Sequence, residues 1–141
     1  RDRSVSRGLG DVYKRQDCYN ASPDSQKAAL DVLSSFKSNR RIAVLGDMLE
    51  LGKYSDVSHE NVGKYTENKN IDILFTYGEK AKHIAEGAKG FVDEIKSFDD
   101  KTELVKALLE TLKDGDAVLF KASRGMKLED VINSLYREWE E

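Results

Sequence analysis

The sequence predicts an α/β fold, a three-layer Rossmann-like domain in which helices cover both faces of a mostly parallel sheet. Two observations lead to this prediction. Short apolar runs alternate along the chain with segments whose apolar residues recur at helical spacing, and such alternation favours parallel strands joined by right-handed crossovers. The length of 141 residues is that of one domain, and 39% of the residues are hydrophobic, which is enough for one core.

Each element has a local signal. Ser22, Pro23 and Asp24 form a helix start, with a capping hydroxyl, a proline at the first helical position and an acid near the positive helix end. The apolar run that ends at Gly46 predicts a buried strand. The elements predicted in order are a helix over 23–36, a strand over 41–45, a helix over 56–68, a strand over 71–77, a helix over 80–88, a short edge strand within 91–98, a helix from 99 or 100 to 112, a strand over 117–120 and a final helix over 128–139.

Composition excludes several classes of protein. No apolar run approaches the roughly 20 residues that a membrane-spanning helix needs. The only cysteine, Cys18, has no partner for an internal disulfide, which favours a reducing compartment. The net charge of −3 argues against a general nucleic-acid-binding domain, because such domains are usually strongly basic.

The first sixteen residues do not share the pattern of the rest. They contain five basic and two acidic residues and have no apolar face to bury. A basic arm that grips an acidic partner is one interpretation, and a tail without a native role is the other. The string resembles a translated sequencing-adaptor read-through, so we expect residues 1–16 to be a non-native, disordered tail. The domain then comprises residues 17–141, and the part of the protein that precedes Asp17 is missing.

Ligands of such folds sit beyond the carboxyl ends of the strands, so the segments that follow the strands are candidate sites. The candidates there are Asp47 and Glu50, which could hold an ammonium group, and Lys121, Ser123 and Arg124, which could bind an anion or a carboxylate. Each segment also has a plainer interpretation. The first could be a tight turn with a hydrophobic plug, and the second a solvated basic turn.

A third candidate precedes the first helix. Asp17, Tyr19 and Asn20 carry groups that bond ribose hydroxyls and phosphates, although helix capping and a turn explain them equally well. His59 and His83 have no cysteine or acid at metal-ligand spacing, so packing or surface roles are expected. No phosphate-binding loop, dinucleotide fingerprint or nucleophile motif is present. The residues alone therefore indicate a ligand-binding domain without a catalytic motif of its own.

Three strings, in order and correctly spaced, resemble the carboxyl-terminal domain of the Mur ligase family. They are DCYNASPDS at 17–25, RIAVLGDMLELG at 41–52 and KASRGMKLE at 121–129, and the likeness runs over residues 17–141. The branch that they resemble adds D-alanyl-D-alanine to UDP-N-acetylmuramoyl-tripeptide. Two positions depart from the pattern: Ser22 replaces the usual Asn, and Ala122 replaces the usual Gly, where a methyl narrows the approach of a ligand to the backbone.

The resemblance implies a cytoplasmic, monomeric bacterial ligase of peptidoglycan precursor synthesis that uses ATP and Mg²⁺. The tripeptide carboxylate is activated as an acyl phosphate and is then attacked by the amine of D-alanyl-D-alanine. In the family, an amino-terminal and a central domain precede this one, and the central domain supplies the phosphate loop and the metal ligands. This chain alone is therefore expected to be inactive.

The resemblance also implies roles for single residues. The assignments are Asp17, Tyr19 and Asn20 to the nucleotide, Lys121, Ser123 and Arg124 to the cleft where the dipeptide and the phosphates meet, and Asp47 and Glu50 to substrate binding. Two other interpretations compete with this one. The first is a stand-alone nucleotide- or dipeptide-binding module. The second is a receiver-like signalling module whose acid and lysine are imitated by Asp47 and Lys121, although the acidic pair of a receiver is missing after the first strand.

Overall fold

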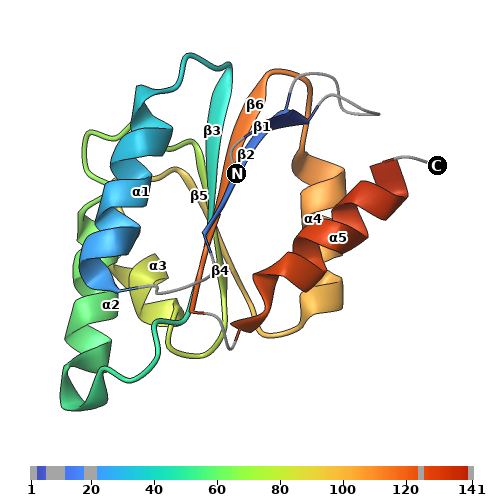
Figure 1. The fold of residues 1–141 in the computed structure, drawn as a ribbon. Coiled ribbons are helices and arrows are strands. Elements are labelled where there is room, and N and C mark those ends of the chain that lie inside the picture. The colour runs from blue at the N-terminus through green and yellow to red at the C-terminus, as the bar shows by residue number, and fades with distance from the viewer. Residues whose placement is uncertain (1–2, 6–11, 18–21, 124–125, 140–141) are drawn as a thin grey trace.

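A computed structural model describes residues 3–5, 12–17, 22–123 and 126–139. Its centre is a six-stranded sheet with the order β1-β2-β6-β3-β4-β5. The strands are β1 (Arg3–Val5), β2 (Val12–Asp17), β3 (Arg40–Gly46), β4 (Ile73–Tyr77), β5 (Glu94–Phe98) and β6 (Asp116–Lys121). Neighbouring strands pair in parallel except β1, which is antiparallel to β2. The last strand, β6, therefore lies in the middle of the sheet (Figure 1).

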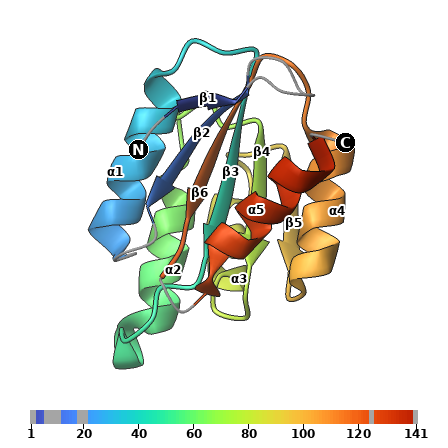
Figure 2. The ribbon, with the colours of Figure 1, turned by 45° about the vertical axis from the view of Figure 1, so that its right-hand side comes forward.

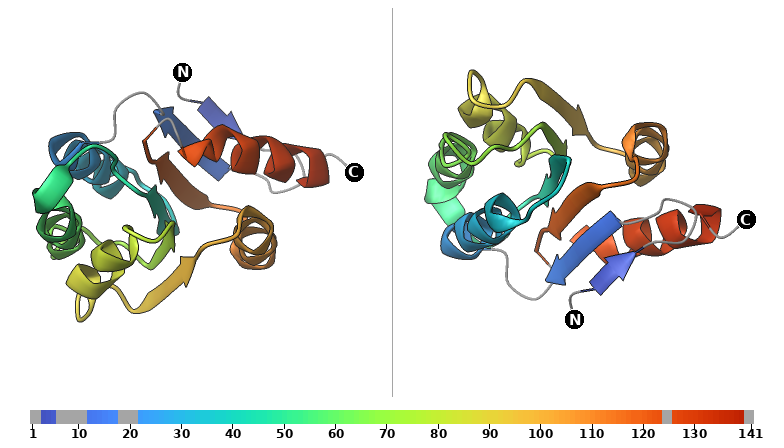
Figure 3. Two further views of the ribbon diagram at one scale, coloured as in Figure 1. Left: turned by 90° about the horizontal axis from the view of Figure 1, so that it is seen from below. Right: turned by 90° about the horizontal axis from the view of Figure 1, so that it is seen from above.

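Helices cover both faces of this sheet (Figure 1, Figure 3). One face carries α1 (Pro23–Ser35), α2 (Ser55–Lys64) and α3 (Lys82–Ala88), and the other carries α4 (Lys101–Thr111) and α5 (Leu128–Trp139). A 3-10 turn, η1 (Gly52–Tyr54), leads into α2. Among the described helices, none is long and apolar enough to cross a membrane. The predicted three-layer, mostly parallel architecture is confirmed.

Side chains of the central strand β3 alternate between two cores, because successive residues of a strand point to opposite faces. In β3, Ile42 and Val44 belong to the core under α4 and α5, whereas Ala43 and Leu45 belong to the core under α1, α2 and α3. All four residues are fully buried. The continuous apolar run that predicted this strand thus reflects a sheet that is covered on both faces.

The order of the predicted helices and strands is confirmed, including the short edge strand, β5. One helix is shorter than predicted, because α2 ends at Lys64 and the chain continues in turns. Asn68 and Asn70 have φ values of 61° and 60°. This left-handed conformation is incompatible with a continuing helix, and asparagine adopts it more readily than most residues do.

Part of the segment 1–16 differs from the expected disordered tail. Arg3–Val5 and Val12–Asp17 are strands, and β2 pairs with β6 from Tyr13↔Ala117 to Asp17↔Lys121. The pairing uses main-chain N–H and C=O groups, so it forms without an apolar face or an alternating pattern. Hydropathy therefore missed these strands. That residues 1–16 are non-native stays a prediction.

The strand order contradicts the receiver-like interpretation. In the doubly wound fold of receiver-type modules the parallel strands follow the order 2-1-3-4-5, which leaves the last strand at an edge. Here the last strand, β6, lies between β2 and β3. The positions that imitate a receiver therefore belong to a different topology, and that interpretation is wrong.

The predicted start of α1 is confirmed. Ser22 Oγ accepts a hydrogen bond from the N–H of Ser25 at 3.1 Å, and Ser25 Oγ accepts one from the N–H of Ser22 at 2.8 Å. This reciprocal capping box, with Pro23 in the first turn, satisfies two of the N–H groups that a helix start leaves open. Ser22 in place of Asn therefore leaves the cap intact.

Two glycines let α2 and α3 pack backbone to backbone. A Cβ at Gly63 would overlap the carbonyl oxygen of Ile84, and a Cβ at Gly87 would overlap the carbonyl oxygen of Glu60. Each helix thus places a carbonyl against a glycine of the other. The close approach requires glycine at both positions.

His59 holds the two ends of the segment that joins β3 to α2. Its ring is fully buried, Nε2 accepts a hydrogen bond from the N–H of Met48 at 2.9 Å, and Nδ1 lies 2.7 Å from the carbonyl oxygen of Ser55. Because Nε2 accepts a hydrogen bond, Nδ1 carries the ring proton and donates a hydrogen bond to the carbonyl oxygen of Ser55. The neutral ring thus satisfies both partners. Burial lowers the pKa of His59 below its usual value of 6.5 and favours this neutral form. The packing role expected for His59 is confirmed, and His83 lies at the surface, 3.3 Å from Asp56.

Gly63→Ala should destabilise the chain by about 3 kcal/mol, because the added methyl meets the backbone of α3 and not a side chain that could rotate away. Urea denaturation at neutral pH measures the free energy of unfolding. Asn61→Ala is the matched control, since Asn61 lies on the exposed side of the same helix and its replacement should cost less than about 0.5 kcal/mol. Equal losses in the two variants would show that the helices do not depend on this approach.

The stability of the chain should fall as the pH drops below about 6.5. The unfolded chain then binds a proton on His59 that the folded chain excludes, so this contribution is complete above the unfolded pKa and is lost toward the lower folded pKa. Between pH 7.5 and pH 5.5 the free energy of unfolding should therefore decrease. In urea denaturation at both pH values, His59→Gln should remove most of this decrease and His83→Gln should keep it. An unchanged decrease in the His59 variant would assign the titration to another group.

Candidate functional site

The carboxyl ends of three neighbouring parallel strands, β3, β4 and β6, form the candidate site. Since the strands are parallel, the segments that follow them emerge at one edge of the sheet. This edge is the lower end of the molecule in Figure 1, where the chain leaves β3 toward α2 and leaves β6 toward α5. The segments after β3 and β6, which are distant in sequence, are thereby neighbours in space.

Asp47 fastens the segment after β3 to the segment after β4. Its Oδ1 accepts a hydrogen bond from the N–H of Ala81 at 2.7 Å, and the residue is only 7% exposed. Gly78, at a φ of 111°, makes room for this contact, because a Cβ there would overlap the carboxylate. The carboxylate of Asp47 therefore holds backbone. Glu50, which has a φ of 64°, is exposed.

Ser123 locks the segment after β6 to the segment after β3. Its N–H donates to the carbonyl oxygen of Asp47 at 3.0 Å. Its Oγ accepts a hydrogen bond from the N–H of Leu49 at 2.8 Å, although the two residues are 74 positions apart. The hydroxyl is half-buried at the edge of the sheet, so Ser123 is both a structural tie and a polar group near the surface of the site.

Lys121 is buried in this structure, with an exposed fraction of 2%. It is the last residue of β6, and it is in register with Asp17 of β2 and Leu45 of β3. The field of a cation at such a position is screened less than that of a surface lysine, because little water surrounds it. The side chain of Lys121 is therefore almost entirely covered by protein within the described residues.

Gln26 is a residue of the site region that the sequence reasoning missed. It is fully buried, and its Nε2 donates to the carbonyl oxygens of Gly46 at 3.1 Å and Lys121 at 3.4 Å, which joins the ends of β3 and β6. Its Oε1 is buried without a hydrogen-bond partner. Helical spacing was the one signal in the sequence for the burial of Gln26. Position 26 lies three and four residues before Ala29 and Leu30, on the same buried face of α1.

The methyl of Ala122 faces the interior. The residue is 1% exposed, and a Cβ on Gly46 would lie only 2.6 Å from the Cβ of Ala122. The methyl thus fills the space that Gly46 leaves between β3 and β6. Packing against Gly46 explains the alanine at position 122. Whether its methyl narrows the approach of a ligand to the backbone stays a prediction.

The remaining predicted site residues are only partly described. Asp17 ends β2, and its backbone lies beside that of Lys121. Tyr19, Asn20 and Arg124 lie outside the described residues. The structure therefore brings Asp47 and Ser123 into contact and places the backbones of Asp17 and Lys121 next to each other at the same edge.

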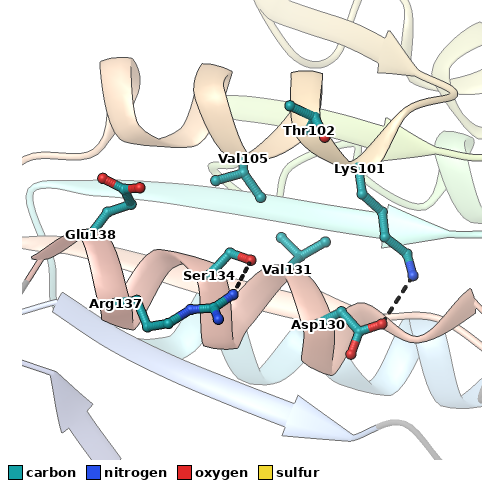
Figure 4. Close-up of a pocket in the computed structure, with 8 residues that line it drawn as sticks. All are labelled: Lys101, Thr102, Val105, Asp130, Val131, Ser134, Arg137 and Glu138. Atoms are coloured by element: carbon teal, nitrogen blue, oxygen red, sulfur yellow. Dashed lines mark hydrogen bonds and ion pairs between the residues drawn. The ribbon is translucent and has the colours of Figure 1, made fainter.

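A separate groove of about 370 Å³ runs between α4 and α5 (Figure 4). Its polar side chains largely satisfy one another: Lys101 Nζ lies 3.1 Å from Asp130 Oδ2, and Arg137 donates to Ser134 Oγ at 3.2 Å. None of the predicted site residues lines it. Over the described residues, no three His, Cys, Asp or Glu side chains cluster in a way that could hold a metal ion. The groove is therefore not part of the candidate site.

Comparison with known proteins identifies the family. The model of the Mur ligase, glutamate ligase domain, matches residues 7–124. The UDP-N-acetylmuramoyl-tripeptide–D-alanyl-D-alanine ligase of Bacillus subtilis is 44% identical over 122 residues, which are 84% of this chain and 27% of that protein. The ligase of the same name from Haemophilus influenzae is 42% identical over 84% of this chain and 26% of its own length. The chain thus spans about a quarter of these relatives.

Solved structures lead to the same family. The MurF ligase of Thermotoga maritima, in complex with ADP, matches 99% of this chain and 30% of its own with a TM-score of 0.80 and 31% identity. A MurF structure from Acinetobacter baumannii matches 97% of this chain and 30% of its own with a TM-score of 0.81 and 26% identity. With its central β6, its interlocked segments after β3 and β6 and a family match over residues 7–124, this chain belongs to the Mur ligase family and carries that family's carboxyl-terminal domain.

Proposed function

We propose that the chain is the last domain of a ligase that joins D-alanyl-D-alanine to UDP-N-acetylmuramoyl-tripeptide during peptidoglycan precursor synthesis. The observation that carries the proposal is the 44% identity to the Bacillus subtilis ligase over 84% of the chain. The geometry supports it, because the segments after β3 and β6 meet at the edge of the sheet where ligands of this fold bind. The whole protein acts in the cytoplasm as a monomer.

The reaction uses ATP, and Mg²⁺ accompanies the nucleotide in the preceding domains. The complex of the Thermotoga relative with ADP supports a nucleotide site. We assign the Mg²⁺ ligands to the preceding domains, as the family resemblance implies. The tripeptide carboxylate accepts the terminal phosphoryl group of ATP and ADP is released. The amine of the dipeptide then attacks the acyl phosphate, loses a proton and displaces inorganic phosphate.

The polar groups at the carboxyl edge have different roles in this proposal. Lys121 and Arg124 stabilise the negative charge that develops at the reacting carboxylate and phosphates, since fixed cations do so without rearranging. Ser123 and the exposed Glu50 contact the incoming dipeptide. Asp47 acts by positioning, because its carboxylate is bonded to the N–H of Ala81.

Nucleotide contacts come from the segment before α1. We assign Asp17, Tyr19 and Asn20 to the nucleotide, with Asp17 at the ribose. Closure of this domain on the preceding domains brings these groups to the nucleotide and excludes the water that would hydrolyse an acyl phosphate. The isolated chain binds ligands but does not turn over. The alternative, a stand-alone binding module, predicts the same ligand binding. It differs in that the domain would not support ligation when joined to the preceding domains of a ligase.

A chimera tests the proposed function. Residues 17–141 replace the corresponding last domain of the Bacillus subtilis ligase, joined immediately before Asp17 so that the relative supplies the strand beside β6. The chimera should form the UDP-N-acetylmuramoyl-pentapeptide from tripeptide, D-alanyl-D-alanine and ATP within about tenfold of the parent rate, measured by chromatography of the product. The 44% identity between the domains makes this exchange reasonable.

The control chimera carries the last domain of the Haemophilus influenzae ligase, which is 42% identical to this chain. If the control ligates and the chimera with residues 17–141 binds nucleotide without ligating, the stand-alone binding interpretation replaces the proposal. If the chimera joins a different amino acid or peptide, the ligase assignment holds and the substrate assignment is wrong.

Ser123→Ala in the chimera should lower kcat/KM for D-alanyl-D-alanine roughly tenfold, because the acceptor for the N–H of Leu49 and one polar contact are lost together. Ser134→Ala is the matched control, since Ser134 lies in α5 on the separate groove and its loss should change kcat/KM less than twofold. Steady-state kinetics with varied dipeptide measure both. Equal effects of the two substitutions would remove Ser123 from the site.

A further inference from the structure

Three consecutive residues after β3 are held by side chains and backbone from other parts of the fold. The carbonyl oxygen of Asp47 accepts a hydrogen bond from the N–H of Ser123 at 3.0 Å. The N–H of Met48 donates to Nε2 of His59 at 2.9 Å. The N–H of Leu49 donates to Oγ of Ser123 at 2.8 Å. Figure 2 shows the segment that carries these residues leaving the lower end of β3 and turning back into α2. His59 and Ser123 therefore hold neighbouring N–H groups of one short segment.

The bond between Met48 and His59 fixes this segment relative to α2. Both residues are fully buried. A buried N–H that loses its acceptor is not readily compensated by water, so the ring of His59 determines where the backbone of Met48 lies. The ring itself is fixed from its other side, since Nδ1 lies 2.7 Å from the carbonyl oxygen of Ser55, one helical turn earlier.

The hydrogen bond from Met48 requires the neutral ring. A protonated histidine carries an N–H at both nitrogens, so the proton on Nε2 would face the N–H of Met48. Two donors at the present separation of 2.9 Å repel each other, and the backbone of Met48 has to move. Leu49 is the next residue, so this movement displaces the N–H that Ser123 Oγ accepts. Protonation of His59 is thereby coupled to Ser123 through two adjacent peptide groups.

Groups from several parts of the fold act on the ring of His59. Burial has the largest effect and opposes the charged form, as does His83 of α3. The carbonyl of Ser55 and the carboxylates of Asp47 and Asp56 favour the charged form. The balance holds the pKa of His59 below its usual value of 6.5. At neutral pH the ring is therefore neutral and accepts its hydrogen bond.

We propose that His59 is a positioning residue for the ligation, whose neutral ring holds residues 47–49 against Ser123 and whose protonation releases them. This rests on the proposed function, which assigns Ser123 to the incoming dipeptide. His59 is fully buried and acts through Met48 and Leu49 without touching the substrate. Loss of the neutral ring should therefore weaken the binding of D-alanyl-D-alanine and leave the binding of ATP unchanged.

The first test follows ligation by the chimera from about pH 5 to pH 8 with varied dipeptide. His59→Gln is the informative variant, because the glutamine amide offers an acceptor and a donor and does not titrate. Dividing kcat/KM of the parent by that of His59→Gln cancels the titration of the substrates. This ratio should be constant above about pH 6.5 and should fall below it by up to about tenfold per pH unit, as for one proton. His83→Gln is the control and should follow the parent. A flat ratio, or a loss that disappears in His83→Gln, overturns the proposal.

A second variant separates positioning from stability. His59→Leu removes both hydrogen-bonding groups, so KM for D-alanyl-D-alanine should rise roughly tenfold, whereas KM for ATP should change less than about twofold. At neutral pH, His59→Gln should restore KM to within about threefold of the parent. A variant that was only less stable would contain less active enzyme, which lowers kcat and leaves both KM values unchanged. That result would overturn the proposal.

The coupling is also measurable without ligation. In NMR spectra of the chain, the amide signals of Met48 and Leu49 should shift with the same midpoint as the ring of His59, while the amide of the exposed Asn61 should not. If the ring titrates without these shifts, or only as the whole chain unfolds, the proposal is overturned. If the parent chimera does not ligate although the Haemophilus control does, the proposed function fails, and this titration still decides whether His59 positions the segment.

Discussion

The parallel pairing of β3 with β6 is the contact on which the candidate site depends. The pairing begins at Arg40↔Asp116 and ends at Leu45↔Lys121, so the first predicted strand and the last strand of the chain share one register. Arg40 donates two hydrogen bonds to the Asp116 carboxylate, at 2.9 and 2.7 Å, and Asp116 raises the pKa of the guanidinium. This two-point contact fixes the register at one end of the strands. At the other end of the strands, the same register brings Asp47 beside Ser123. A slip by one residue would move every side chain to the other face of the sheet.

Buried polar side chains specify the carboxyl edge after this pairing has formed it. Gln26 joins the carbonyls of two strand ends, Asp47 holds the N–H of Ala81, and His59 holds Met48 and Ser55. Each of these side chains bonds to backbone, and a buried donor or acceptor left without a partner costs about 1–3 kcal/mol. The segments after the strands consequently have one favoured conformation, although they contain little regular secondary structure. Rigid segments can present both polar groups and exposed apolar side chains, such as Tyr54 and Val57, in fixed positions.

Local sequence signals predicted most of the fold, because apolar runs, caps and glycine stops each report a short stretch of chain. The capped start of α1 at Ser22 and the buried run of β3 are examples. The central place of β6 and the pairing of β2 could not be predicted this way, since both depend on main-chain contacts between distant segments. In the site, Asp47 and Ser123 were recognised as polar residues at strand ends, but their bonds to backbone were not. A packing role was expected for His59 but its bonds to Met48 and Ser55 were not, and Gln26 was missed, because burial is a property of the folded chain.

The strand β2 has a further consequence for the integrity of this domain as a separate unit. It protects one side of β6 through main-chain pairing alone, and its register with β6 runs from Tyr13 to Asp17. A polypeptide cut just before Asp17 would keep both cores and all the helices described, yet one side of its central strand would become an open edge. Open edges recruit strands from other molecules. The integrity of this domain therefore depends on the polypeptide segment that pairs with the open side of β6.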